Sequence, residues 1–343
     1  LSILDVFTQY ELPLTAFEPH TVHPDSAAFD DQLTRFAAVC RVVRGLRRLV
    51  VGAIGARTTA FKTIRFDELA FQRKGITVES LDLSEVFRRI RALSGDAEAV
   101  RDRIRRLEAY TGFGKVPPKK TEMLAKVSCV LDDLVAEYRM DCLALRCWDE
   151  LEREFGISPC VLLSEMNDRG LAAACELDVC NAVAMHALKL ASGRPAICLD
   201  WNNNYGEDPD RCILFHCGPV AQSLMAGPGE VIDHLMFAKA YGEGCGWGCN
   251  VGRIAPFPMT FLSSRTDRGE VVWYMGEGEF TDDPIEEGFF GCGGVARIPD
   301  LQGKLLRIGK GGFRHHVGVT SGHWEAAVRE ALTTYLGYPT YDI

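Results

Sequence analysis

The sequence lacks both an excess of positive charge and any long apolar run. Its 343 residues carry a formal net charge of -9. This charge argues against nonspecific binding to nucleic acid or to an anionic membrane, since both need a basic surface. No apolar run reaches the roughly 18 residues that a membrane span needs, and no segment has the regions of a secretory signal peptide. We therefore expect a cytoplasmic protein that binds neither nucleic acid nor membrane.

Signatures of phosphate binding and of serine hydrolases are also missing. The glycines of GAIGARTTAF, residues 52–61, form neither GxxxxGK[ST] nor GxGxxG, so they give no support to nucleotide binding. A GxSxG elbow, which would place a nucleophilic serine on a sharp turn, is absent too.

Cysteine is abundant, but its pattern is not that of a disulfide framework or a zinc finger. The 13 cysteines are odd in number, and most lie inside apolar runs, as Cys142, Cys198 and Cys212 do. Buried free thiols in a reducing compartment are the better interpretation. Cys245 and Cys249 have CxxxC spacing, but no second pair follows at finger-like distance, so a zinc site is the weaker alternative.

The length predicts more than one domain. Residues 1–33 have no regular pattern, and the sequence starts at Leu1 in a stretch that resembles the interior of a longer segment. We therefore expect a linker or the remnant of an N-terminal α/β domain. Residues 34–193 alternate between apolar runs and helical periodicity, which predicts a doubly wound parallel-sheet domain of the α/β class. Within it, strands are expected at 49–55, 75–83, 141–147 and 159–165.

After residue 193 the pattern changes to short strand-like runs separated by glycine-rich turns. Residues 194–343 are therefore predicted to form a mainly β, barrel-like C-terminal domain that ends in a helix at 324–335. A hairpin is expected around 267–269, and KLLRIG, residues 304–309, is interpreted as a strand.

Three groups that can bind a metal or move a proton follow one another in apolar settings: Glu176, Asp200 and His216. Carboxylates at the edge of a core need a partner, because burying an unpaired charge is costly. A divalent cation is a common partner for two converging carboxylates. The structural alternatives are that Glu176 favours a helix N-terminus, that Asp200 starts a turn, and that His216 is a satisfied core residue.

Further candidates lie closer to the C-terminus. His315 and His316 are adjacent, and in a strand adjacent side chains face opposite sides. One is thus expected to enter a cleft while the other supports it, unless the two form a solvated pair. Trp247, within the sequence GWGCN, is interpreted either as a sugar-stacking wall or as part of a glycine-rich loop.

Several of these segments together resemble the L-fucose isomerase and L-arabinose isomerase superfamily, and the resemblance is closer to the fucose type. The matching segments are ACELDV at 174–179, the aspartate of ICLDWNN, the histidine of LFHCG, FRHHVGV at 313–319, and VVGAIGARTTAFKTIRFDE followed by GITVESLDLSEV. The resemblance runs from about residue 30 to the end of the chain.

The resemblance implies a site and an assembly. In fucose-type enzymes a Glu, an Asp and a His hold a divalent metal, and these correspond to Glu176, Asp200 and His316, with His315 as the alternative third ligand. The metal is usually Mn²⁺, with Mg²⁺ or Co²⁺ as substitutes. Arabinose-type enzymes add a second histidine, for which His216 is the candidate, but they have Glu where this chain has Asp200. A homotrimer or homohexamer is implied.

The implied activity is a metal-dependent aldose–ketose isomerisation of a monosaccharide by ene-diol proton transfer. Glu176 and Asp200 are the expected acid–base residues, while His216, His315 and Trp247 are expected to contact substrate or metal. Two alternatives stay open. One is a non-catalytic sugar-binding or regulatory protein on the same scaffold. The other is an isomerase or epimerase of an anionic sugar, whose recognition would need a basic residue among Arg57, Arg253 and Arg314.

Overall fold

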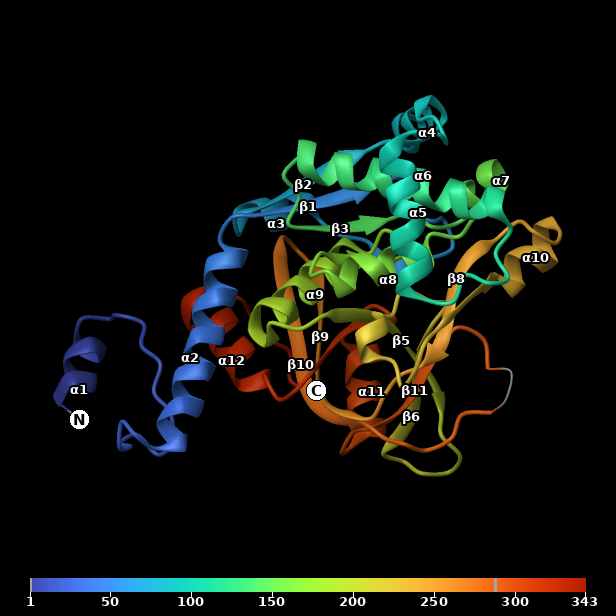
Figure 1. The fold of residues 1–343 in the computed structure, drawn as a ribbon. Helices are drawn as coiled ribbons and strands as arrows, with labels where there is room; N and C mark the ends of the chain where they lie inside the picture. Colours follow the sequence, from blue (N-terminus) through green and yellow to red (C-terminus); the bar gives the residue numbers. More distant parts are fainter. Residues whose placement is uncertain (1, 287–288) are drawn as a thin grey trace.

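The computed structural model describes residues 2–286 and 289–343, so Leu1 of the expected N-terminal remnant lies outside the described residues. This part of the chain contains a four-stranded and an eight-stranded sheet, with helices packed against both (Figure 1). None of its helices combines the length and the apolar character that crossing a membrane would require.

The four-stranded sheet is parallel, as the alternating pattern predicted. Its strands are β1 (Leu49–Ile54), β2 (Ile76–Leu81), β3 (Cys142–Leu145) and β4 (Ala172–Ala174), in the order β2-β1-β3-β4. The strand order reverses between β1 and β3. In open α/β sheets, ligands bind outside the carboxyl ends of the strands at such a switch point.

Helices cover both faces of this sheet, which confirms the doubly wound arrangement. Along β3, Cys142 and Ala144 join one core while Leu143 and Leu145 join the other, because successive side chains of a strand face opposite sides. The first face packs on α2 (Ala27–Leu46), α3 (Glu68–Arg73) and α9 (Val179–Ser192), and the second on α4 (Leu83–Ala92), α5 (Glu98–Tyr110), α6 (Pro118–Glu137) and α8 (Cys160–Asp168).

The eight-stranded sheet closes into a barrel, as expected for the C-terminal half. Its order is β10-β9-β12-β5-β6-β11-β8-β7, and a further pairing of β10 with β11 joins the ends of the first six strands. Closure removes exposed strand edges. The bounds are β5 (Ala196–Asn204), β6 (Arg211–His216), β7 (Glu230–Asp233), β8 (Trp247–Arg253), β9 (Phe257–Asp267), β10 (Glu270–Phe280), β11 (Cys292–Arg297) and β12 (His316–Ser321).

The hairpin expected around 267–269 joins β9 to β10, where Asp267 pairs with Glu270. The terminal helix is also present, as α12 (Glu325–Glu330) followed by a π-helical turn (Ala331–Tyr335). Shorter elements are α1 (Ser2–Gln9), α7 (Glu150–Phe155), α10 (Leu235–Tyr241) and the 3₁₀ turns Lys62–Ile64 and Gln222–Leu224.

Two strand predictions are wrong. Of the strand expected at 159–165, residues 160–165 lie in α8, whose apolar side chains are buried on every side. A helix that is buried all round has no apolar stripe that distinguishes it from a strand. Residues 304–309 lie in α11 (Leu301–Lys310). Leu301, Leu305 and Ile308 have helical spacing and pack into the barrel core, a pattern that a six-residue window is too short to show.

Helix α9 connects the two sheets. It contacts β3 and β4 on one side and β5, β9 and β12 on the other, and one apolar core contains Ala174 of the parallel sheet, Val183 of α9 and Leu262 of the barrel. Gly193 ends α9 in a left-handed conformation (φ 67°), which a glycine adopts without steric cost. The predicted division at residues 193 and 194 falls here, and the three predicted domains stay a prediction.

Candidate active site

Of several cavities in the described part of the chain, two are candidates for a binding site, and of these two the smaller contains converging polar groups. The larger, of about 890 Å³, lies beside α2 and is mainly apolar. The smaller, of about 360 Å³, is lined by Glu176, Asp200, His216 and His315 together with aromatic side chains. Binding sites combine an apolar wall with a few convergent polar groups, so we identify the smaller cavity as the candidate active site.

Glu176 lies at the carboxyl end of β4, in a tight turn that leads into α9. Glu176 and Leu177 both have left-handed backbone conformations (φ 60° and 64°), which cost a non-glycine residue about 1–3 kcal/mol each. Backbone hydrogen bonds from Leu177 N–H to Leu145 (3.1 Å) and from Asp178 N–H to Cys175 (3.0 Å) hold the turn. The strained turn brings the Glu176 carboxylate to the cavity.

Asp200 and His316 belong to neighbouring antiparallel strands of the barrel. They are direct partners in the register of β5 and β12, and side chains of directly opposed residues lie close together on one face. Strand pairing therefore sets these two groups beside each other, although 116 residues separate them in the chain, as their numbering shows.

The side chains of Glu176, Asp200 and His316 converge. The Nε2 atom of His316 lies 3.5 Å from Oε2 of Glu176 and 3.5 Å from Oδ1 of Asp200. All three atoms are buried and have no hydrogen-bond partner among the described residues. Buried polar atoms are nearly always paired. One further group that contacts both carboxylate oxygens and the imidazole nitrogen would therefore complete this arrangement.

A buried ion pair orients His316 from behind. The Oδ2 atom of Asp178 lies 2.9 Å from Nδ1 of His316, and Nη1 of Arg314 donates to Oδ1 of Asp178 at 2.5 Å. Burial alone raises the pKa of Asp178, but Arg314 and His316 outweigh it and hold that pKa below its ordinary value. The ionised carboxylate accepts a hydrogen bond from Nδ1–H, so Nε2 is the nitrogen that faces Glu176 and Asp200.

Competing effects act on the protonation of His316. Burial lowers its pKa, but charges and a hydrogen bond nearby raise it to about 10, through Cys198, Asp178, Glu176 and Asp200. The ring thus carries a proton at Nε2 when no cation is bound. Metal binding at this atom would release that proton, since a ligating imidazole must be neutral.

His315 approaches the same carboxylates from the solvent side. Its Nε2 atom lies 3.4 Å from Oε2 of Glu176 and 3.8 Å from Oδ1 of Asp200, and its Nδ1 atom is 2.7 Å from the hydroxyl of Thr63. The two side chains do not face opposite sides of a strand, because His315 precedes the first residue of β12; His315 lines the cavity, while His316 is buried next to it. The two ring centroids are 4.1 Å apart.

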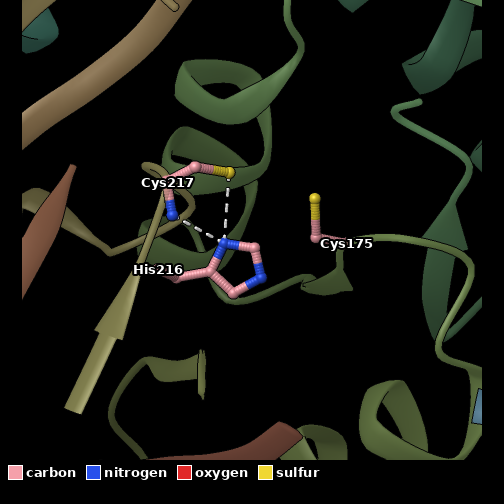
Figure 2. A group of neighbouring side chains, drawn as sticks. All are labelled: Cys175, His216 and Cys217. Carbon is pink, nitrogen blue, oxygen red and sulfur yellow. Dashed lines mark hydrogen bonds between the residues drawn. The ribbon is translucent and has the colours of Figure 1, made fainter. Parts of the chain in front are cut away.

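His216 lies deeper in the site. Its ring stacks on that of His316, with centroids 5.3 Å apart, and its Nδ1 atom accepts a hydrogen bond from the backbone N–H of Cys217 at 2.8 Å (Figure 2). With Nδ1 acting as acceptor, a neutral His216 carries its proton on Nε2. This tautomer has no free lone pair to offer at Nε2 toward the Glu176–Asp200 site.

Sequence reasoning missed the aromatic side chains of the cavity. Phe61, Trp148, Trp201 and Phe215 line it, and Phe61 packs edge-on against Trp148 with centroids 5.4 Å apart. Trp247 is not among the lining residues. It starts β8, and its backbone carbonyl accepts the N–H of Ser158. Phe61 and Trp148 follow the parallel strands β1 and β3, so strand position was the signal that could have found them, whereas Trp201 and Phe215 lie within β5 and β6.

None of the three arginines considered for anion binding lines the cavity. Arg314 is fully committed to Asp178 and the Ser264 carbonyl, Arg253 pairs with Asp282 beside a different cavity, and Arg57 donates to backbone carbonyls of its own loop. Among the described residues, no lysine or arginine contributes to the lining of the candidate site.

The convergent atoms of Glu176, Asp200 and His316 fit a divalent metal. Two carboxylate oxygens with one imidazole suit Mn²⁺, Mg²⁺ or Co²⁺ better than an ion that prefers thiolates. A cation would also satisfy the three unpaired buried atoms. Glu176, His315 and His316 are close enough together to share one ion, so His315 stays the alternative third ligand.

Comparisons with known proteins agree with these features. The family of the L-fucose isomerase C-terminal domain matches residues 214–343. A sulfoquinovose isomerase of Priestia aryabhattai is 27% identical over 203 residues, which is 59% of this chain and 45% of that protein. A sulfoquinovose isomerase of Clostridium sp. (strain MSTE9) is 28% identical over the same shares.

The aligned region covers 45% of the Priestia aryabhattai protein, so the chain spans about half the length of these curated relatives. Residues 214–343, with β6, β12 and the paired histidines, carry the similarity to the L-fucose isomerase C-terminal domain. Together the comparisons support the membership of this chain in the L-fucose isomerase and L-arabinose isomerase superfamily, which its motifs predicted.

Proposed function

We propose that this chain carries the active site of a metal-dependent aldose–ketose isomerase that acts on a monosaccharide. The observation that carries the proposal is the convergence of three unpaired buried atoms, on Glu176, Asp200 and His316. Glu176 and Asp200 line a cavity large enough for a sugar. The similarity to L-fucose isomerase and to sulfoquinovose isomerases supports the same reaction class.

Glu176 and Asp200 are the groups that move protons in this proposal. Both line the cavity, so a sugar bound there presents its first two carbons to two carboxylates. One carboxylate removes the carbon-bound proton, and the other exchanges the hydroxyl proton. An ene-diol pathway needs both of these proton transfers. His315, with Nε2 3.4 Å from Glu176, is placed to share a proton with that carboxylate.

Glu176, Asp200 and His316 would hold the metal, and Asp178 would fix the orientation of His316. A bound Mn²⁺, for which Mg²⁺ or Co²⁺ are substitutes, supplies electrostatic stabilisation of the negative charge that develops on the two substrate oxygens. The hydrogen bond from His316 to Asp178 increases the basicity of the ligand and fixes its ring, the usual role of a carboxylate behind a metal-bound histidine.

The lining of the cavity favours a neutral sugar. Trp148 and Trp201 offer flat apolar surfaces, and Glu176 and Asp200 contribute two carboxylates, which repel an anionic substrate. The second candidate is the isomerisation of an anionic sugar, favoured by the similarity to sulfoquinovose isomerases. That substrate would need a cationic group from outside this lining, such as one from a neighbouring chain. A non-catalytic sugar-binding role is less well supported, since both carboxylates face the cavity.

We also propose that the chain assembles as a homotrimer or homohexamer. Helix α1 and the segment after it stand apart from the two sheets, beside α2 (Figure 1). Their apolar side chains Ile3, Val6, Phe7 and Tyr10 are exposed. The large cavity beside α2 is apolar and carries Arg44, Arg47 and Arg48, which complement the acidic Asp5 and Glu11 of that segment on a second copy.

A ketose-formation screen tests the activity. The protein is stripped with a chelator, supplied with Mn²⁺, and incubated with L-fucose, L-arabinose and sulfoquinovose in parallel. Ketose formation that needs Mn²⁺ and is lost on chelation is the expected result. Turnover of sulfoquinovose alone would favour the anionic substrate over the neutral one. Sugar binding without ketose formation in every metal-loaded sample would contradict the proposed isomerase.

A further inference from the structure

A cluster of buried thiols lies directly behind the carboxylate site. It consists of Cys147, Cys160, Cys175 and Cys217, which we call the thiol cluster; all four are free and buried. They come from four separate segments: the loop after β3, the start of α8, the end of β4 and the residue after β6. Cys175 precedes Glu176, and Cys217 follows His216, so the cluster joins the segments that carry two residues of the candidate site.

The sulfur atoms are close enough to act together. Cys160 Sγ lies 3.6 Å from Cys217 Sγ, and Cys147 Sγ lies 3.0 Å from Cys175 Sγ. The Sγ atoms of Cys175 and Cys217 and a ring nitrogen of His216 all lie within 4.8 Å of one another (Figure 2). The Nδ1 atom of His216 is 3.2 Å from Cys217 Sγ.

Two of these distances are close to the edges of a tetrahedral metal site. With Zn–S bonds of about 2.3 Å and Zn–N bonds of about 2.0 Å, the sulfur–sulfur edge of a tetrahedron is about 3.8 Å and the nitrogen–sulfur edge about 3.6 Å. The Cys160–Cys217 separation is close to the first edge and the His216–Cys217 separation close to the second, whereas Cys147 and Cys175 are too close together to share one ion.

The donor set differs in kind from that of the carboxylate site. Thiolates favour Zn²⁺ and other soft ions, while carboxylates suit Mn²⁺ or Mg²⁺, so the two neighbouring sites would favour different metals. Cys217 also lines the cavity, which gives an ion a path to the cluster. Cys245 and Cys249, the pair with zinc-like spacing, bond instead to the backbone carbonyls of Tyr241 and Cys217.

We propose that Cys175, Cys217 and His216, whose ligand atoms lie within 4.8 Å of one another, form a second metal site that binds Zn²⁺, with Cys160 beside Cys217 as the candidate fourth ligand. His216 uses Nδ1 and exchanges its hydrogen bond from the Cys217 amide for the metal. The ion would tie the strained turn at Glu176 to the end of β6 and to α8, so its role is to hold the carboxylate site in shape. The site does not depend on the proposed isomerase activity.

Cobalt spectroscopy tests the site without an activity assay. The wild-type chain is stripped of metal, reduced, and titrated with Co²⁺ in the presence of saturating Mn²⁺. We expect thiolate-to-cobalt charge-transfer absorption that saturates at about one ion per chain. Zn²⁺ should abolish this absorption and raise the melting temperature. Elemental analysis of the Zn²⁺-loaded protein should then find zinc that Mn²⁺ does not displace.

Substitutions locate the ligands. Cys175→Ser and Cys217→Ser should each eliminate the charge-transfer absorption, while Cys212→Ser, which changes a buried cysteine of the barrel core outside the cluster, should leave it intact. Wild-type protein that shows no thiolate absorption and no stabilisation by Zn²⁺ would overturn the proposal, whether or not the variants fold. Equal absorption in wild type and Cys217→Ser would do the same.

Discussion

Asp178 and His316 share a hydrogen bond of 2.9 Å in an environment that excludes water from both side chains. Asp178 also begins α9, where its Oδ1 atom accepts the N–H of Asn181 at 3.0 Å. One carboxylate thus caps the helix between the two sheets and fixes the imidazole that faces Glu176. The orientation of the candidate metal ligand is therefore coupled to the packing of the core.

Removing the charge of Asp178 should damage both stability and metal binding. Asp178→Asn leaves Arg314 buried without its anion, a change that costs about 3–5 kcal/mol of unfolding free energy. Loss of the support behind His316 should weaken metal affinity by about 10–100-fold. Denaturant unfolding and metal titration measure the two effects. Asp267→Asn, which removes an exposed partner of Arg265, is the control and should change neither; an unaltered metal affinity in Asp178→Asn would contradict the positioning role.

Glu176→Gln and Asp200→Asn should each lower turnover by at least about 100-fold, the usual scale for losing a positioned acid or base. Both substitutions keep the shape of the side chain but remove its charge, so metal affinity should fall as well. Initial rates at saturating Mn²⁺ separate the two losses. Glu207→Gln, in an exposed turn, serves as the matched control. Near-normal rates at saturating metal would remove the substituted residue from the mechanism.

Glu152 should make stability decrease as the pH rises. Burial raises its pKa from 4.5 to about 9, so between these values the folded protein keeps a proton that the unfolded chain releases. The unfolded state then binds fewer protons, and the free energy of unfolding falls with increasing pH. Glu152→Gln can still accept the hydrogen bond from Ser158 but does not titrate.

Urea unfolding of wild type and Glu152→Gln, at about pH 5 and about pH 8, measures this effect. The wild type should lose stability relative to the variant as the pH increases through this window. Parallel pH profiles for the two proteins would show that Glu152 ionises in the folded state as readily as in the unfolded chain.

Polar substitutions in α1 should weaken the proposed assembly. Val6 and Phe7 are exposed, at 47% and 41%, and in a trimer or hexamer their apolar surface would pack against a second copy. Val6→Asp combined with Phe7→Asp should reduce the mass found by light scattering, whereas Gln9→Asp on the same helix should not. A wild-type protein that is a 37.9 kDa monomer with full activity would rule out a required neighbour.

The local pattern of apolar and polar residues in the sequence determined the architecture. The alternation of apolar runs and helical periodicity before residue 193, and the close-spaced strand patterns after it, predicted the parallel sheet, the barrel and the terminal helix that the structure contains. Such patterns record which face of an element is buried. They failed for α8 because it is buried on all sides, so its apolar residues have no preferred face.

Only the tertiary structure decided which side chains meet. The motifs selected Glu176, Asp200 and His316 as candidates, but the register of β5 against β12 and the turn after β4 bring them together. The pairing of Asp178 with Arg314, and the gathering of cysteines from positions 147, 160, 175 and 217, leave no spacing pattern in the sequence. Contacts between distant segments depend on how elements pack, whereas periodicity carries information about each element alone.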